Sequence, residues 1–278
     1  MLETKIVPVQ NPLLKDCIQY FIFFKTYFNE KISYRTFPNT NLCLAIYKQN
    51  KVDYIKNEHQ NICEIKQGGN SYSSRLFGFH ESPFEVYSQS CFEQICILFH
   101  PAGLRAFTNI PYQTLQSENN VFDIVFDNNN YLLDQVFNTS NISKKAGLLQ
   151  DFLLKKKRST FIDNPMNFVI NEINAANGDI KAETLAEMLG INSSTLYRRF
   201  NSYTGQNPKD FIQTVRFRAA LSLMSKRKYK NLTDLTYHAN YYDQSHLIKD
   251  FKKYTGEAPH IFQRKVTIED NELTWIVK

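Results

Sequence analysis

The chain has 278 residues, of which 42% are apolar, and its 22 Phe and 16 Tyr supply enough material for two packed domains. The sequence opens without a basic start and an apolar run, and its densest apolar stretch, residues 17–24, is far too short to cross a bilayer, so we expect a soluble chain in the cytoplasm. None of the five cysteines belongs to a Cys-x-x-Cys pair, which favours reduced and mostly buried thiols.

The first hundred residues have the pattern of short β-strands between turn residues. β-Branched and aromatic residues gather in segments that are bounded by Pro, Asn, Gly and Ser. The expected strands cover residues 42–47, 52–55, 75–79, 84–87 and 94–99, and Gly68-Gly69-Asn70-Ser71 is expected to be a turn. We therefore predict a small antiparallel β-barrel or sandwich, followed by helices over roughly 102–107, 131–137 and 143–157.

The last of these helices carries apolar residues at a helical spacing, namely Ala146, Leu149, Phe152 and Leu153. This stripe is a candidate dimer contact, and packing onto its own barrel is the alternative. A basic run ending at Arg158 closes the helix and is expected to be a cap and linker, because cations are favourable at a helix C-terminus. It divides an α+β chain into two domains, residues 1–158 and 159–278, of which the second is expected to be all-α from Pro165 onward.

The charge is distributed unevenly between these two domains. Residues 181–265 contain 15 Lys and Arg against 7 Asp and Glu, a net charge of +8, so the rest of the chain carries −2 within the total of +6. A compact basic block beside a nearly neutral remainder indicates a polyanion partner for that block. A solvated basic surface would have the same composition, so charge alone does not decide between the two.

A helix-turn-helix pattern runs over about residues 181–203. Its first short helix is stopped by Gly190, which can adopt the left-handed conformation, and Asn192 or Ser193 can cap the next helix. In that second helix, Leu196 and Phe200 lie four residues apart and face back onto the first. The residues that are predicted to contact DNA in the major groove are Ser193, Ser194, Tyr197 and Arg198.

The same pattern returns over about residues 232–254. Asn240 stands where Gly190 stood, and Asn is the next best residue in a left-handed turn. Asp243 can cap the following helix, in which Leu247 and Phe251 repeat the spacing of the first unit. The predicted DNA-contacting residues here are Gln244, Ser245, Ile248 and Lys249, of which Gln244 suits the readout of adenine. Because a repeat is a stronger signal than either copy, we expect two helix-turn-helix units joined by a linker helix over about 208–226.

Residues from about 165 to 265 resemble the DNA-binding domain of bacterial AraC/XylS-type transcription regulators. The similar segments are LAEMLGINSSTLYRRF, YTGQNP, VRFRAALSLM and YYDQSHLIKDFKKYTGEAP. The resemblance implies that the outward residues of both second helices contact bases or backbone of duplex DNA, and that Arg216 is the linker-helix arginine of the family. The family has Gly where Asn240 stands and Ala where Thr236 stands, so we expect a slightly reshaped second unit.

The N-terminal half also resembles sensor domains that are attached to this family. The similarity rests on Phe99-His100-Pro101-Ala102-Gly103-Leu104, followed by Asn109-Ile110-Pro111, which is similar to a strand-to-helix segment of a cupin-like subset. We therefore expect an effector or dimerisation domain that takes an unknown small molecule. RNA polymerase and a second copy of the chain are further partners in this interpretation.

Two function classes remain open. One is a one-component transcription regulator without enzymatic activity. The other is a barrel enzyme or a DNA-repair methyl acceptor fused to the same DNA-binding domain, which would need a metal triad or an activated cysteine. The histidines His59, His80 and His100 have no metal-ligand spacing, and Cys91 and Cys96 flank a strand, so we expect no metal, no cofactor and no catalytic residue.

Overall fold

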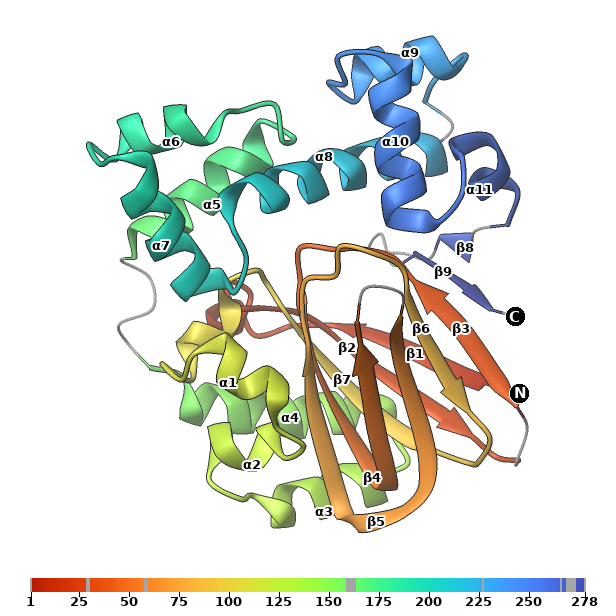
Figure 1. The fold of residues 1–278 in the computed structure, drawn as a ribbon. Coiled ribbons are helices and arrows are strands. Elements are labelled where there is room, and N and C mark those ends of the chain that lie inside the picture. Colours follow the sequence, from red (N-terminus) through yellow and green to blue (C-terminus); the bar gives the residue numbers. More distant parts are fainter. Residues whose placement is uncertain are drawn as a thin grey trace.

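The computed structural model describes residues 2–28, 31–57, 60–158, 164–226, 228–265, 267–268 and 274–277. A curled β-sheet with helices against one side forms the N-terminal half, and a layer of helices lies across one end of that sheet (Figure 1). The expected α+β architecture, a β-barrel-like domain followed by a helical one, is confirmed. The expected domain boundary falls next to residues 159–163, which lie outside the described residues.

Seven strands of the N-terminal half form one curled sheet. Their order is β1-β2-β7-β4-β5-β6-β3, and neighbouring strands are antiparallel except for β5 and β6, which run parallel. The strands are β1 (Leu2–Pro8), β2 (Ile18–Thr26), β3 (Ile32–Thr36), β4 (Leu42–Lys56), β5 (Asn61–Phe77), β6 (Phe84–Ser88) and β7 (Glu93–Phe99).

Strand β7 lies in the middle of the curl and is buried on both faces. Ile95, Ile97 and Phe99 pack into a core beneath the helices, while Cys96 and Leu98 point into a second core inside the curl. Successive side chains of a strand alternate between faces, so burial of both faces requires an unbroken apolar run. This is why residues 95–99 show no polar alternation.

The predicted strands 42–47 and 52–55 are parts of one strand, β4, which forms a long hairpin with β5. The pairing is irregular between Lys48 and Asn50, where Gln49 has a φ of 57°. Gly68 and Gly69 lie on the facing stretch of β5 with φ values of 94° and 118°. The prediction of a turn at Gly68–Ser71 is therefore wrong, because these left-handed residues form a bulge that bends the hairpin without reversing the chain.

Helices cover the outer face of the sheet. They are the short 3-10 turn η2 (Gly103–Ala106) and the helices α1 (Tyr112–Ser117), α2 (Val121–Phe126), α3 (Asn130–Asn138) and α4 (Ile142–Lys156). The apolar stripe of α4 is in the core, since Ala146, Leu149 and Leu153 are at most 2% exposed. Phe152 is half-buried and packs against Phe126, with ring centroids 5.5 Å apart. The stripe thus packs onto its own domain, and the hypothesis that it forms a dimer contact is wrong.

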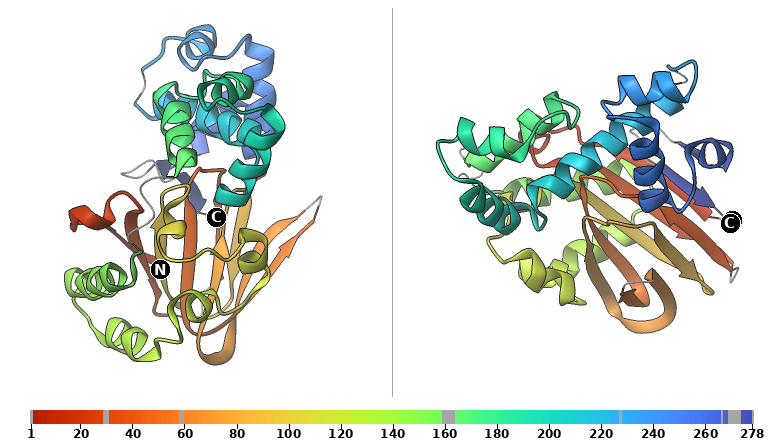
Figure 2. Two further views of the ribbon diagram at one scale, coloured as in Figure 1. Left: turned by 90° about the vertical axis from the view of Figure 1, so that its left-hand side faces the viewer. Right: turned by 45° about the horizontal axis from the view of Figure 1, so that its top comes forward.

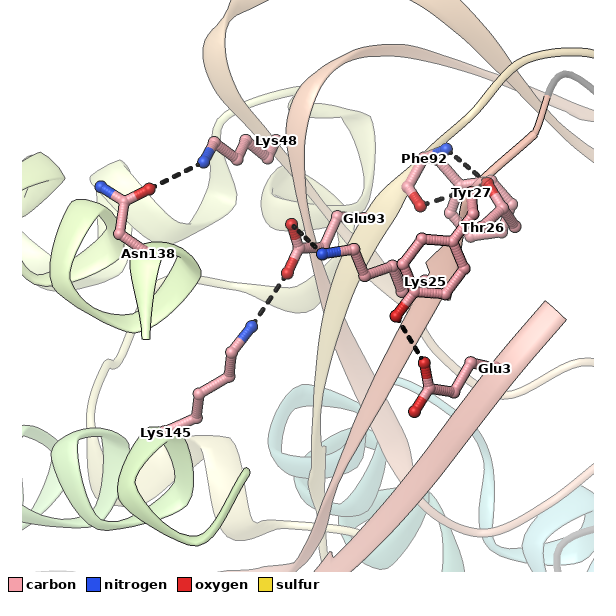
Figure 3. A network of polar contacts seen from close by, with 9 residues as sticks. All are labelled: Glu3, Lys25, Thr26, Tyr27, Lys48, Phe92, Glu93, Asn138 and Lys145. Atoms are coloured by element: carbon pink, nitrogen blue, oxygen red, sulfur yellow. Dashed lines mark hydrogen bonds and ion pairs between the residues drawn. The ribbon is translucent and has the colours of Figure 1, made fainter. Parts of the chain in front are cut away.

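Side-chain hydrogen bonds and ion pairs connect α3 and α4 to the sheet (Figure 3). Lys145 on α4 is buried and donates to Glu93 on β7, with an Nζ–Oε1 distance of 2.9 Å. The second carboxylate oxygen of Glu93 lies 4.0 Å from Nζ of Lys25 on β2. Lys48 on β4 donates to Oδ1 of Asn138 at the end of α3, over 3.0 Å.

The C-terminal half contains seven helices in the described residues. They are α5 (Pro165–Ala175), α6 (Ala182–Met188), α7 (Ser193–Thr204), α8 (Pro208–Ser225), α9 (Leu232–His238), α10 (Gln244–Thr255) and α11 (Pro259–Lys265). None of the described helices combines the length and apolarity needed to span a membrane. The two recognition helices α7 and α10 lie near opposite ends of α8, with their C-terminal ends toward the sheet (Figures 1 and 2).

The expectation that everything after Pro165 is helical is wrong at the C-terminal end. Strands β8 (Thr267–Ile268) and β9 (Thr274–Val277) pair with each other, and β9 pairs with β3 at the edge of the N-terminal sheet. The unsatisfied edge of β3 accounts for this addition, because an open edge is a template for one more strand.

Gly103 is expected to tolerate no side chain. A Cβ there would lie 1.9 Å from the carbonyl oxygen of Cys17, a backbone atom that also accepts from the His100 N–H. We expect Gly103→Ala to lower the free energy of unfolding by more than about 3 kcal/mol, since the backbone must move. Gly147 in α4 has open space around its Cβ position, so Gly147→Ala should raise stability by up to about 1 kcal/mol through helix propensity. Urea unfolding of both variants measures the difference, and equal destabilisation would contradict the close approach at Gly103.

Candidate nucleic-acid interface

The first helix-turn-helix unit consists of α6, a tight turn and α7. Gly190 has a φ of 62° and ends the turn after α6, as predicted. Asn192 is the N-cap of α7, and its side chain accepts from the Thr195 N–H over 2.8 Å. Leu196 and Phe200 are at most 1% exposed, so one side of α7 is fixed in the core while the opposite side faces outward.

The second unit has the same construction in α9 and α10. Asn240 has a φ of 57° and takes the left-handed role expected of it. Asp243 caps α10 by accepting from the His246 N–H over 2.7 Å, and Leu247 and Phe251 are fully buried. Thr236, which stands where the resembling family has Ala, is accommodated because its hydroxyl donates to the Leu232 carbonyl over 2.7 Å.

Helix α8 supports both units through aromatic contacts. Phe211 packs edge-on against Phe200 of α7 at a centroid distance of 5.5 Å, and Phe217 packs edge-on against Phe251 of α10 at 5.2 Å. Arg216 adds a polar link, since its Nη2 donates to the Gly178 carbonyl after α5 over 2.7 Å. Its guanidinium also lies 5.8 Å from the ring centre of Tyr241 in the second unit. Arg216 therefore links the segment after α5 to the second unit from the helix between them.

The predicted DNA-contacting residues are placed on the outer sides of the two recognition helices. The exposed ones are Ser193, Ser194, Tyr197, Arg198, Gln244, Ser245 and Lys249, and Ile248 is partly buried. The Gln244 side-chain amide donates to the Thr233 hydroxyl over 2.6 Å, so an adenine would have to replace that hydrogen bond. The other exposed residues form one accessible patch on each helix.

Sequence reasoning missed the most exposed aromatic residue of this region. Tyr242 is 94% exposed directly before the N-cap of α10. The N-cap Asn192 comes two positions after Gly190, whereas the N-cap Asp243 comes three positions after Asn240. The second turn is thus one residue longer, and the change of offset between the repeats was a signal that pointed to Tyr242.

One acidic group lies inside the second unit. Asp250 is buried at 6% exposure, and its carboxylate lies 3.8 Å from Nε2 of His246. Burial raises the pKa of Asp250, and the nearby His246, Lys253 and Arg216 oppose that rise. The Asp250 carboxyl therefore lies beneath the outer surface of the second unit and is not presented on it.

Three of the five thiols, those of Cys17, Cys63 and Cys96, are buried in the core. Burial raises the pKa of Cys17 to about 11 and that of Cys63 to about 12, and it also raises the pKa of Cys96 well above its ordinary value. A reactive cysteine needs the opposite shift, because the thiolate is the nucleophile. In the part of the chain that the structure describes, no three His, Cys, Asp or Glu side chains are grouped as metal ligands.

Known proteins match both halves of the chain. Residues 185–265 match a family described as helix-turn-helix domain, and residues 8–121 match a family described as a domain of unknown function (DUF6597). A Formosa agariphila protein described as histidine kinase P4 is 28% identical over 98 residues, which are 35% of this chain. The match spans only 7% of the length of that relative.

Similar solved structures include ToxT and the DNA-binding domain of AdpA. ToxT from Vibrio cholerae is similar over 95% of this chain and 98% of its own, at 14% identity and a TM-score of 0.41. The DNA-binding domain of AdpA, described as a global transcriptional factor and solved with a target DNA, covers 37% of this chain and 92% of its own, at 21% identity and a TM-score of 0.33.

Two capped helix pairs on one central helix, each with an exposed second helix, define a double helix-turn-helix protein. That class of fold places its second helices in the major groove of DNA. The family match over residues 185–265 agrees with this arrangement, since that family is described as a helix-turn-helix domain.

Arg198 is expected to be the strongest single contact of the first unit. If its exposed guanidinium reads a guanine, Arg198→Ala should weaken specific binding by about 1–3 kcal/mol and relax the preference at one base position. Titration of the full chain against a selected site and its single-base variants measures both effects. Lys252→Ala is the matched control, because it removes one exposed positive charge from the last turn of α10.

A uniform loss over all sequences, with a salt slope lower by about one, would instead identify a phosphate contact. No difference between Arg198→Ala and Lys252→Ala would contradict a role for Arg198 in recognition.

Proposed function

We propose that the chain is a one-component transcription regulator that recognises specific duplex DNA sites through both helix-turn-helix units. The observation that carries this proposal is the exposure of two matched recognition helices whose buried sides are locked onto the same helix, α8. The proposed DNA contacts are Ser193, Ser194, Tyr197 and Arg198 in the first unit and Gln244, Ser245, Ile248 and Lys249 in the second. Gly190, Asn240 and Arg216 hold these residues in place.

The spacing of the two units suits one face of a duplex. Helix α8 has 18 residues and is therefore about 27 Å long, close to the roughly 34 Å that separate successive major grooves. Duplex DNA in a bacterium lies in the cytoplasm, which is where we propose that the protein acts. RNA polymerase, and a second copy of the chain bound through a surface other than the α4 stripe, are partners that such a regulator would meet.

Two adjacent major grooves should be protected by one molecule. We expect binding-site selection with the full chain to return a site with two conserved segments about one helical turn apart. Hydroxyl-radical footprinting of that site should show protection of both segments on the same face of the duplex. A footprint limited to half a turn would contradict the use of both units.

The N-terminal domain offers a cavity for the proposed effector. The cavity measures about 120 Å³ and lies inside the curl of the sheet, where apolar side chains of β2, β4, β6 and β7 line it. Two of its other lining residues connect it to the DNA-binding half. Phe37 packs edge-on against Phe262 of α11 at 4.8 Å, and Arg218 belongs to α8. A small molecule in this cavity would therefore touch residues that also touch the helix-turn-helix domain.

An effector should lose its effect when the cavity is filled. We expect a compound that raises the melting temperature of the full chain to change its DNA affinity as well, because binding is coupled only if the two states differ in affinity. Cys43 lines the cavity and Cys91 does not, so Cys43→Phe should abolish the thermal shift and Cys91→Phe should keep it. A compound that shifts the melting temperature without changing DNA affinity would contradict the effector role.

A further inference from the structure

Arg105 in the N-terminal domain contacts the C-terminal end of the first recognition helix. It lies in η2 and is 9% exposed. Its Nε donates to the carbonyl of Tyr203 over 3.1 Å, and its Nη2 donates to the carbonyl of Ser202 over 3.0 Å. Both carbonyls belong to the last turn of α7, so one guanidinium of the first domain holds two carbonyls of the second.

These carbonyls are ones that a helix cannot satisfy by itself. The last four carbonyls of an α-helix have no partner within it, and they carry the negative end of the helix dipole. In α7, the Gly205 N–H donates to the carbonyl of Asn201. Arg105 donates to the next two carbonyls, those of Ser202 and Tyr203. A buried cation at this end therefore stabilises the last turn through hydrogen bonds and through charge.

The ring of Tyr112 also packs against this contact. The Arg105 guanidinium lies 4.2 Å from the ring centre of Tyr112 in α1. A Cβ on Gly205, which ends α7 with a φ of 84°, would lie 3.1 Å from the Tyr112 side chain. The ring of Tyr112 thus lies against both the guanidinium and the end of the recognition helix, which fixes their separation.

Arg105 is itself held rigidly by its own domain. Its Nη1 donates to the carbonyl of Ile110 over 2.6 Å. Two residues earlier, Gly103 lies against the carbonyl of Cys17, with no room for a side chain. The segment Phe99–Leu104, which resembles a motif of sensor domains, is therefore the base from which Arg105 reaches α7.

The contact adjoins the DNA-facing surface without covering it. Arg198 lies one turn before Ser202 on the same side of α7, and it lines a hollow of about 620 Å³ together with Arg105 and Asn109 of the N-terminal domain. Ser194, Tyr197 and Arg198 stay exposed while Arg105 is docked. The docked arrangement therefore sets the position of the helix and leaves its reading surface open.

We infer that Arg105 is a positioning residue for the first recognition helix and sets its DNA affinity from the other domain. The inference rests on the proposed DNA-binding function, and it extends that function by naming the contact through which the N-terminal domain acts on α7. The second unit has no part in this contact, so the effect is confined to the half of the DNA site that α7 reads.

Arg105→Gln in the full chain tests the inference with two measurements. Hydrogen exchange of the free protein should become faster in the last turn of α7, residues 200–206, and stay unchanged in the matching turn of α10, residues 251–257. Affinity for the selected DNA site should fall about tenfold. The loss should vanish on a site whose first-unit half, identified with Arg198→Ala, has been scrambled.

Two further variants separate positioning from general stability. Lys145→Gln removes a buried cation of the same domain that pairs with Glu93, so it should lower the melting temperature without changing either measurement. Arg105→Lys keeps the charge but not the two-pronged geometry, and it should give intermediate affinity.

Unchanged hydrogen exchange in the last turn of α7 would overturn the inference. So would an affinity loss in Arg105→Gln that is the same on the intact DNA site and on the site with a scrambled first-unit half. Failure of the wild-type chain to select any DNA site would refute the proposed function instead. In that case the exchange comparison alone still decides whether Arg105 holds the end of α7.

Discussion

Phe211 and Phe217, six residues apart on α8, each meet the buried aromatic residue of one recognition helix. Six residues of α-helix correspond to a rise of about 9 Å and a rotation of about 240°, so these two contacts fix both the separation and the relative rotation of α7 and α10. The proposed recognition of two adjacent grooves needs this constraint, because two units that move independently would lose conformational entropy when both bind.

Among the contacts between the N-terminal domain and the C-terminal helices, two differ in chemistry. At the first unit Arg105 donates to two carbonyls of α7, with a geometry specified by hydrogen-bond directions, and apolar residues of both halves share one core there. At the second unit the contact is apolar, since Phe37 packs into the core around Phe262. Apolar packing tolerates small sliding better than a two-pronged hydrogen bond does.

The sequence predicted what depends on short-range chemistry. Gly190, Asn240, Asn192 and Asp243 act within a few residues of their partners, and their turns and caps are where the repeat placed them. Features that depend on contacts between distant segments were not predicted from the sequence. The bulge at Gly68 depends on the irregular stretch of β4 that faces it, β9 depends on the open edge of β3, and Arg105 shows no local pattern that points to α7, 97 residues away. The apolar stripe of α4 was visible, but its partner was not, because a stripe looks the same whether it covers its own sheet or another chain.

The cavity inside the curl is lined in part by residues that belong to the C-terminal helices or contact them. Its wall includes Phe37, which reaches the second unit, and Arg218, which lies on α8 two residues beyond Arg216. A molecule that changed the position of either residue would act on the frame that sets the spacing of α7 and α10, while Arg105 kept the end of α7 fixed to the N-terminal domain. By linkage, the DNA that favours one spacing must then strengthen or weaken effector binding by the same factor. The coupling therefore requires no contact between effector and DNA, only two arrangements of α8 against the sheet that differ in affinity for each.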